Sequence, residues 1–223
     1  MSDAVLTIKS LTVDFGPFRA VDGVDISIRR GSITGLIGPN GAGKTTLFNA
    51  ITGSLKPSVG QVVLAGKDVT GLSPDMLFET GMGRTFQIPR PFSRMSVLEN
   101  VMLAPVGQIG ERPSGAFLAR KGMRAQEKLI RERAMETLDF MTLAALADHP
   151  AGKISGGQMK LLELARVLMG DPQVILLDEP AAGVNPILAG TLMEKVEALN
   201  RQGKTFVIIE HDMDIIMRHC DPI

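Results

Sequence analysis

The sequence contains a single cysteine and neither tryptophan nor tyrosine among its 223 residues. One cysteine, Cys220, excludes a disulfide framework and a cysteine-rich zinc site, so we expect a thiol in a reducing compartment. Basic and acidic side chains number 24 each, which leaves a formal net charge of zero. This balance argues against a domain that binds duplex nucleic acid through bulk positive charge, and we expect no nucleic-acid partner.

The sequence also lacks membrane and secretion signals. No stretch approaches the roughly 18 to 20 consecutive apolar residues of a spanning helix. The N-terminal residues are not a basic patch followed by an apolar block, as in a secretory signal. With 44% hydrophobic residues the chain can form a core, and we expect a cytosolic protein that is able to dock on a membrane partner.

The hydrophobic pattern predicts an α/β fold. Alternation over Val24–Ile28 predicts a half-buried strand, and Val59–Leu64 with Lys67–Thr70 predicts a hairpin. Two short apolar runs, Val174–Leu177 and Phe206–Ile209, are typical of central parallel strands covered on both faces. Further predicted elements are a strand at Ile33–Ile37 and helices at Lys44–Thr52, Arg124–Met141, Ser155–Met169 and Pro186–Leu199. Helical periodicity dominates the middle of the chain, so we expect a core of residues 1–87 and 166–223 split by a helical insertion at 88–165.

A glycine-rich loop follows the strand predicted at Ile33–Ile37. Its sequence, Gly38-Pro39-Asn40-Gly41-Ala42-Gly43-Lys44-Thr45, fits the pattern G-x-x-x-x-G-K-[ST] between a strand and a helix. Such a loop wraps a polyphosphate with backbone N–H groups, and the new helix directs its N-terminal dipole at the phosphates. We expect Lys44 to reach the β- and γ-phosphates and the Thr45 hydroxyl to ligate Mg²⁺. The loop indicates a nucleotide but not what is done with it.

Two carboxylates end the apolar strand at Val174–Leu177. Ligands of open α/β sheets lie at the carboxyl ends of the strands. There Asp178 suits a place one step outside the direct ligands of Mg²⁺, and Glu179 suits a base that orients or deprotonates an attacking water. The alternative is a polar strand end that leads into a turn at Pro180.

The segment Ser155-Gly156-Gly157-Gln158 opens a predicted helix and has two interpretations. Ser155 and Gln158 have the spacing of a capping box and could simply cap their own helix. However, two adjacent glycines are poor helix formers, costing about 1 kcal/mol each relative to alanine. We therefore favour an exposed helix start that binds a second anion, at which Gly157→Asp would be tolerated structurally.

His211 follows the apolar run Phe206–Ile209, at a strand end like that of Asp178. A lone histidine is more often structural than catalytic, but this position adds weight to the alternative that His211 faces the γ-phosphate. Gln87 lies at the junction of the core and the insertion, and its position alone predicts no role.

Together these motifs resemble the ATP-hydrolysing subunits of ABC transporters, over nearly the whole chain. The resemblance implies a P-loop NTPase (RecA-like) core with an antiparallel β subdomain and an inserted helical subdomain. It implies that Gln87 is a hinge that touches Mg²⁺, that Glu179 is the catalytic base and that His211 is the γ-phosphate switch. An aromatic near the N-terminus stacks on adenine in this family, for which Phe15 fits best and Phe18 is the second candidate. The implied ATP contacts are Phe15, Gly38, Pro39, Asn40, Gly41, Ala42, Gly43, Lys44, Thr45 and Thr46, with Mg²⁺ at Thr45, Gln87 and Asp178.

The resemblance also implies partners. Ser155, Gly156, Gly157 and Gln158 would bind the ATP held by a second ABC ATPase subunit, homologous or paralogous, in a head-to-tail dimer. Integral membrane permeases would convert ATP-driven closure into transport, with a solute-binding protein acting indirectly. The implied location is the cytoplasmic face of the inner (plasma) membrane.

A narrower resemblance is to ATPases of branched-chain amino acid importers, the LivG type. It is carried by Arg84–Gln87, Met95–Val101 and Glu179–Pro186. Importers of urea or amides are similar, and a soluble ABC ATPase without transport is a further alternative. The chain departs from the wider family at Ile154, usually Leu, and at Asn185, usually Asp. It also stops at Ile223, where members continue through further strands, so we expect C-terminal strands to be missing.

Overall fold

The computed structural model describes residues 3–109 and 120–223 and divides the chain into two compact units. The first unit comprises Met1–Gln87, Pro172–Ala182 and Ala189–Ile223, and the second comprises Ile88–Asp171 and Gly183–Leu188. The second division thus falls after Asp171, whereas the sequence placed it after residue 165. The helix α6 (Gly156–Leu168) contacts two other helices of the second unit and belongs to that unit.

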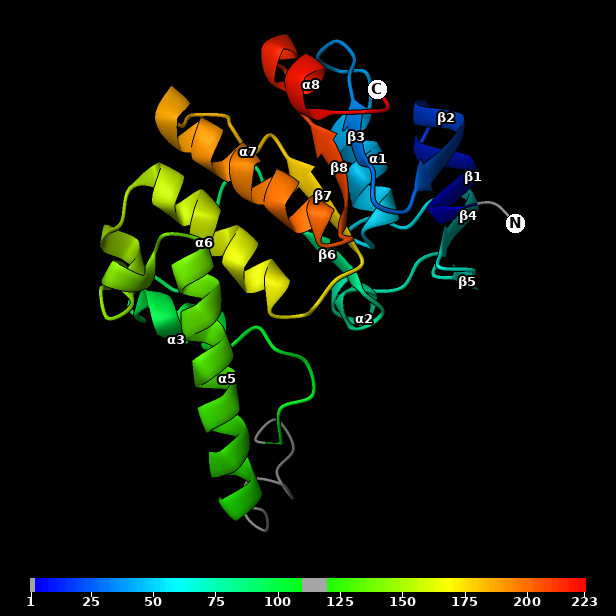
Figure 1. The fold of residues 1–223 in the computed structure, drawn as a ribbon. Helices are drawn as coiled ribbons and strands as arrows, with labels where there is room; N and C mark the ends of the chain where they lie inside the picture. The colour runs from blue at the N-terminus through cyan, green and yellow to red at the C-terminus, as the bar shows by residue number, and fades with distance from the viewer. Residues whose placement is uncertain (1–2, 110–119) are drawn as a thin grey trace. The chain divides into compact units, whose positions relative to one another are not determined.

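An antiparallel sheet of order β2-β1-β4-β5 forms one layer of the first unit (Figure 1). Its strands are β1 (Ala4–Phe15), β2 (Phe18–Arg29), β4 (Val59–Leu64) and β5 (Lys67–Asp68). The β4–β5 hairpin confirms the sequence prediction, whereas β1 was not predicted. Ser10, at a positive φ of 45°, lies where the register shifts, and this bulge breaks the alternation that a strand prediction needs.

A parallel sheet of order β3-β8-β7-β6 forms the other layer of this unit. Its strands are β3 (Ile33–Leu36), β6 (Met82–Arg84), β7 (Val174–Asp178) and β8 (Thr205–Ile209). Every residue of β7 and β8 is buried, which confirms them as central strands. Because all four strands run the same way, the segments that follow them meet at one edge of the sheet.

One hydrophobic core joins the two sheets through α1 (Lys44–Ile51), which follows β3 (Figure 1). Phe48 and Leu47 of α1 are buried among β1, β4, β7 and β8 residues. Burial fixes the direction of α1, and with it the loop at its N-terminus. The first unit also contains α2 (Pro74–Glu79), the part of α7 (Pro186–Arg201) from Ala189 onward, and α8 (Met213–His219).

The second unit is helical. It contains α3 (Val97–Met102), α5 (Arg120–Phe140), α6 and two short 3-10 helices at Ala144–Leu146 and Ala151–Lys153. The start of α3 is a complete capping box, because Ser96 Oγ accepts from Glu99 N at 3.1 Å and Ser96 N donates to Glu99 Oε2 at 2.7 Å. The helix α7 (Pro186–Arg201) begins in this unit, and Asn185 caps it by accepting from Leu188 N at 2.9 Å.

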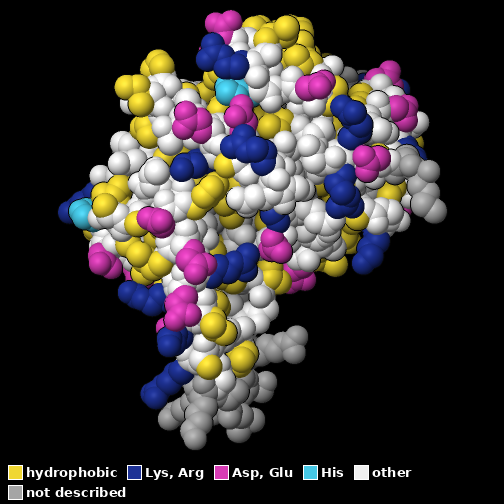
Figure 2. Space-filling view, in the orientation of Figure 1, with side chains coloured by type: hydrophobic (Ala, Val, Ile, Leu, Met, Phe, Trp, Pro, Cys, Tyr) yellow, Lys and Arg dark blue, Asp and Glu magenta, His cyan; other side chains and the backbone are white. Residues whose placement is uncertain are grey.

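The surface carries mixed charge. On the face drawn in Figure 2, lysine and arginine lie among aspartate and glutamate rather than in one patch of a single sign. Within the described part of the chain, none of the helices has the length and apolar character needed to cross a bilayer.

Candidate active site

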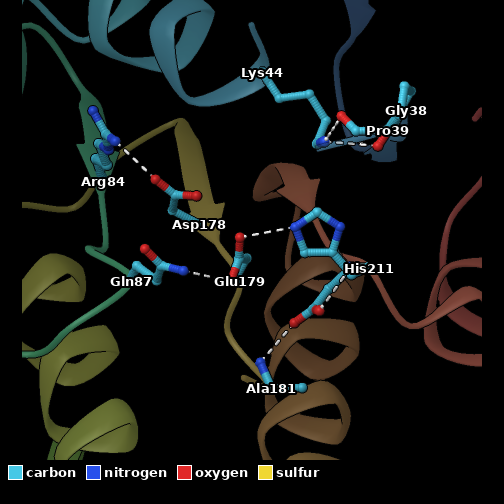
Figure 3. A network of polar contacts seen from close by, with 10 residues as sticks. Gly38, Pro39, Lys44, Arg84, Gln87, Asp178, Glu179, Ala181 and His211 are labelled. Carbon is cyan, nitrogen blue, oxygen red and sulfur yellow. Dashed lines mark hydrogen bonds and ion pairs between the residues drawn. The ribbon is translucent and has the colours of Figure 1, made fainter. Parts of the chain in front are cut away.

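The glycine-rich loop connects β3 to α1 as expected. Gly43 caps α1 with a φ of 84°, and a side chain there would place its Cβ only 2.5 Å from the Ala20 carbonyl oxygen. Glycine is therefore required by both conformation and space. Lys44 is buried and curls back over the loop, where Nζ donates to Gly38 O at 2.7 Å and Pro39 O at 2.9 Å (Figure 3). This places the ammonium group inside the loop's curve, where a phosphate would be cradled.

A cavity of about 280 Å³ lies over the loop. Phe15 and Phe18, which are cross-strand partners at the β1–β2 turn, both line it, and both are exposed, at 51% and 66%. Both phenylalanine rings are therefore available to stack on a planar ring bound in the cavity. The other lining residues are Ala20, Asn40, Gly41, Ala42, Gly43, Lys44, Thr45, Thr46, Glu179 and His211.

Asp178 ends β7 with its side chain only 4% exposed. Its Oδ2 accepts from Arg84 Nη2 at 2.9 Å, whereas Oδ1 is buried and has no hydrogen-bond partner among the described residues. In Figure 3 this second oxygen points away from Arg84. A buried carboxylate oxygen without a donor is costly unless a ligand completes its environment.

Glu179 is at the centre of a polar cluster formed from three chain segments (Figure 3). Gln87 Nε2 donates to Glu179 Oε2 at 2.6 Å, and His211 Nε2 lies 3.0 Å from Glu179 Oε1. Glu179 also has a positive φ of 48°, which non-glycine residues rarely adopt and which is found preferentially at functional sites. The structure thus brings together Glu179 and His211, which the sequence placed at two strand ends, and Gln87, which it placed at the junction of the core and the insertion.

Glu210 is a member of this cluster that sequence reasoning missed. Its carboxylate is buried and accepts from Ala181 N at 2.6 Å and from His211 N at 3.2 Å. It therefore ties the turn after Glu179 to the segment that carries His211. The only signal in the sequence was its place directly before His211 at a strand end.

Arg84 is the second residue that sequence reasoning left without a role. Its guanidinium, 9% exposed as a side chain, bonds to Asp178 and to two residues of the α1 region, Asn49 and Thr52. The sequence carries little indication of this role, because an arginine beside a short strand is usually interpreted as a surface residue.

Ser155 and Gln158 form the capping box that their spacing predicts. Ser155 Oγ accepts from Gln158 N at 3.3 Å, and Ser155 N donates to Gln158 Oε1 at 2.8 Å. Gly156 is exposed, and a Cβ built on it meets nothing within 4 Å. The expectation that Gly157 is an equally open surface position is wrong. Gly157 is buried, and a Cβ there would lie 2.5 Å from Leu188 Cδ1 and 3.0 Å from Val184 Cγ1.

The donor set at the phosphate loop fits a magnesium nucleotide. Hydroxyl, amide and carboxylate oxygens are the ligands that Mg²⁺ prefers, and Thr45, Gln87 and Asp178 carry these groups. In residues 3–109 and 120–223, no three His, Cys, Asp or Glu side chains are grouped to hold a metal ion by themselves. When a magnesium nucleotide is bound, its phosphates would supply part of the coordination, as is usual for Mg²⁺.

Comparison with known proteins identifies the family of the chain. Residues 21–182 match the ABC transporter family. A probable branched-chain amino acid transport ATP-binding protein LivG from Methanocaldococcus jannaschii is 43% identical over 97% of this chain and 84% of its own. The crystal structure of the ADP conformation of an ATP-binding cassette of an ABC transporter superposes with a TM-score of 0.82 at 43% identity, covering 98% of this chain and 85% of that one. A dimeric structure of a bacterial ABC transporter cassette gives a TM-score of 0.78 at 28% identity, covering 97% and 91%. These structures confirm the expected fold.

Proposed function

The chain belongs to the ABC transporter family as an ATP-binding ATPase, and we propose that it powers an importer of branched-chain or related amino acids. The single observation that best supports the hydrolytic part is the cluster of Glu179 with Gln87 and His211, beside the cavity over the phosphate loop. The amino acid substrate is supported by the name of the relative that is 43% identical over nearly the whole chain.

We assign the binding roles as follows. The loop N–H groups and Lys44 hold the phosphates, and either Phe15 or Phe18 stacks on adenine, since both line the cavity. Thr45, Gln87 and Asp178 would hold Mg²⁺, which when bound would neutralise phosphate charge. The buried Asp178 oxygen that accepts no hydrogen bond from the described residues supports this assignment.

For hydrolysis, Glu179 acts as the base that orients and deprotonates the attacking water. His211, 3.0 Å from Glu179, faces the γ-phosphate and holds the carboxylate in place. Gln87, 2.6 Å from the other carboxylate oxygen, links this base to the start of the helical segment. The positive φ of Glu179 supports a functional reading, because such strain persists where surrounding contacts enforce it.

The second unit is then the helical subdomain. Ser155, Gly156, Gly157 and Gln158 bind the ATP of a second cassette, homologous or paralogous, in a head-to-tail dimer. The exposed helix start at Gly156, with its N-terminal N–H groups, supports an anion-binding role. Permease subunits would hold the dimer at the cytoplasmic face of the membrane, with a solute-binding protein acting through them.

Transport tests the substrate assignment. Cells that depend on this system should take up labelled leucine, isoleucine or valine, and should lose that uptake when Lys44→Ala replaces the wild type. Uptake of labelled urea and a short amide in the same cells is the control. Loss of amide or urea uptake alone would reassign the substrate, and retention of all uptake with no membrane partner co-purifying would favour a soluble ATPase.

A further inference from the structure

Arg84 joins the two elements that the proposed ATP site is built on. From the end of β6, its Nη1 donates to Asn49 Oδ1 at 2.7 Å and Thr52 Oγ1 at 2.9 Å, at the C-terminal end of the phosphate-loop helix. Its Nη2 donates to Asp178 Oδ2 at 2.9 Å, at the end of β7. One side chain therefore bridges the element that holds phosphate and the carboxylate assigned to Mg²⁺.

The contact with Asp178 is one-sided. Arginine frequently binds a carboxylate through two parallel hydrogen bonds, using both oxygens. Here only Oδ2 is used, while the buried Oδ1 accepts nothing from the described part of the chain (Figure 3). Because the arginine holds one oxygen, the rotation of the carboxylate is fixed and the other oxygen is presented away from Arg84.

The surroundings explain why the residue is arginine. The guanidinium lies over the rings of Phe48 and Phe86, 5.9 Å and 5.4 Å from their centroids. A planar fork can lie on aromatic faces and reach the helix and the strand at the same time, whereas one lysine ammonium group cannot.

We propose that Arg84 is a positioning residue that orients Asp178 for Mg²⁺. It touches neither nucleotide nor metal, and it acts by fixing which carboxylate oxygen is available and where that oxygen lies relative to α1. Partners of this kind, one step removed from a metal, typically change metal affinity or activity by about 10- to 100-fold when removed. This inference rests on the proposed function, because it takes Asp178 to be at the Mg²⁺ site.

The test compares the full-length wild type with Arg84→Lys and Arg84→Met. The affinity for a fluorescent ATP analogue is measured by titration in EDTA and in Mg²⁺. The Mg²⁺ concentration that gives half-maximal hydrolysis and the melting temperature are measured on the same preparations. We expect both variants to bind the analogue in EDTA as the wild type does, since Lys44 and the loop are untouched. In Mg²⁺ we expect the affinity gain to shrink and the half-saturating Mg²⁺ concentration to rise about tenfold.

Glu197→Ala is the matched control, because it removes the acceptor of another partly buried pair of the first unit, with His219 Nδ1 at 2.6 Å. It should lower the melting temperature without changing the Mg²⁺ dependence. Wild-type Mg²⁺ dependence in a folded Arg84→Lys protein would overturn the inference, as would failure of both Arg84 variants to fold, which would assign Arg84 to stability. If the wild type itself hydrolyses no ATP in Mg²⁺, the proposed function fails instead.

Discussion

Substitutions at the two adjacent glycines at the start of α6 can distinguish whether this segment binds a ligand or only caps its own helix. Gly156→Asp adds a carboxylate where a Cβ meets nothing within 4 Å, at the first residue of a helix, a position that favours acidic side chains. We therefore expect an unchanged or slightly higher melting temperature. If the segment binds the partner's nucleotide, the new charge repels the γ-phosphate and turnover is lost.

Gly157→Ala should behave differently. Its Cβ would overlap Leu188 and Val184 side chains, at 2.5 and 3.0 Å, and overpacking of this kind costs about 1–3 kcal/mol. For a chain of this size that lowers the melting temperature by roughly 2 to 12 °C. A loss of activity in Gly157→Ala could therefore come either from lower stability or from lost nucleotide binding. A loss of activity in a well-folded Gly156→Asp protein indicates lost nucleotide binding.

The assay is ATP hydrolysis and thermal melting on one preparation, with the partner subunit present. Gly190→Asp is the control, because Gly190 is exposed on α7 and a Cβ there also meets nothing within 4 Å. It should keep both fold and turnover. A well-folded Gly156→Asp protein with wild-type turnover would refute the nucleotide role and leave only the capping box of Ser155 and Gln158.

Three further predictions concern the first unit. Lys44→Ala should sharply weaken binding of a fluorescent ATP analogue, because the phosphates lose their main point charge, and unchanged affinity in a titration would remove the phosphate-loop assignment. Glu210→Ala leaves the Ala181 N–H without its acceptor and should cost about 1–3 kcal/mol in urea unfolding, with a lower turnover, and an unchanged stability would contradict the bonding described. Burial, with the Glu210 carboxylate adding to it, raises the pKa of the Cys220 thiol from 9.0 to about 11. The stability that the protonated thiol contributes is thus complete below pH 9 and is lost as pH rises through 11. Over that range the free energy of unfolding of the wild type, measured in urea, should fall relative to that of Cys220→Ala. The same pH dependence in both proteins would contradict this prediction.

Much of the fold could be predicted because its signals are local. The apolar runs of β7 and β8 need no neighbours to be recognised as central strands, and the phosphate loop is a contiguous sequence. The capping box at Ser155 likewise depends on four consecutive residues. Short sequence patterns were therefore enough to predict where β7 and β8 end. The parallel arrangement of the strands brings these ends to one edge of the sheet.

What could not be predicted depends on contacts between distant segments. Arg84 and Asp178 are 94 residues apart, and nothing in either segment signals that they pair. Glu210 is a site residue only because the turn at Ala181 folds onto it. Gly157 is buried because side chains after Glu179 pack over it, and a two-glycine pattern carries no information about that packing.

Steady-state phosphate release by Glu179→Gln, compared with the wild type, tests the central claim most directly. The amide keeps the size of the side chain and can still bond to Gln87 and His211, but it cannot accept a proton from water. We predict that the variant binds the ATP analogue as tightly as the wild type, accumulates as an ATP-bound dimer on gel filtration, and releases no phosphate above background in Mg²⁺. Hydrolysis at the wild-type rate would contradict the assignment of Glu179 as the base.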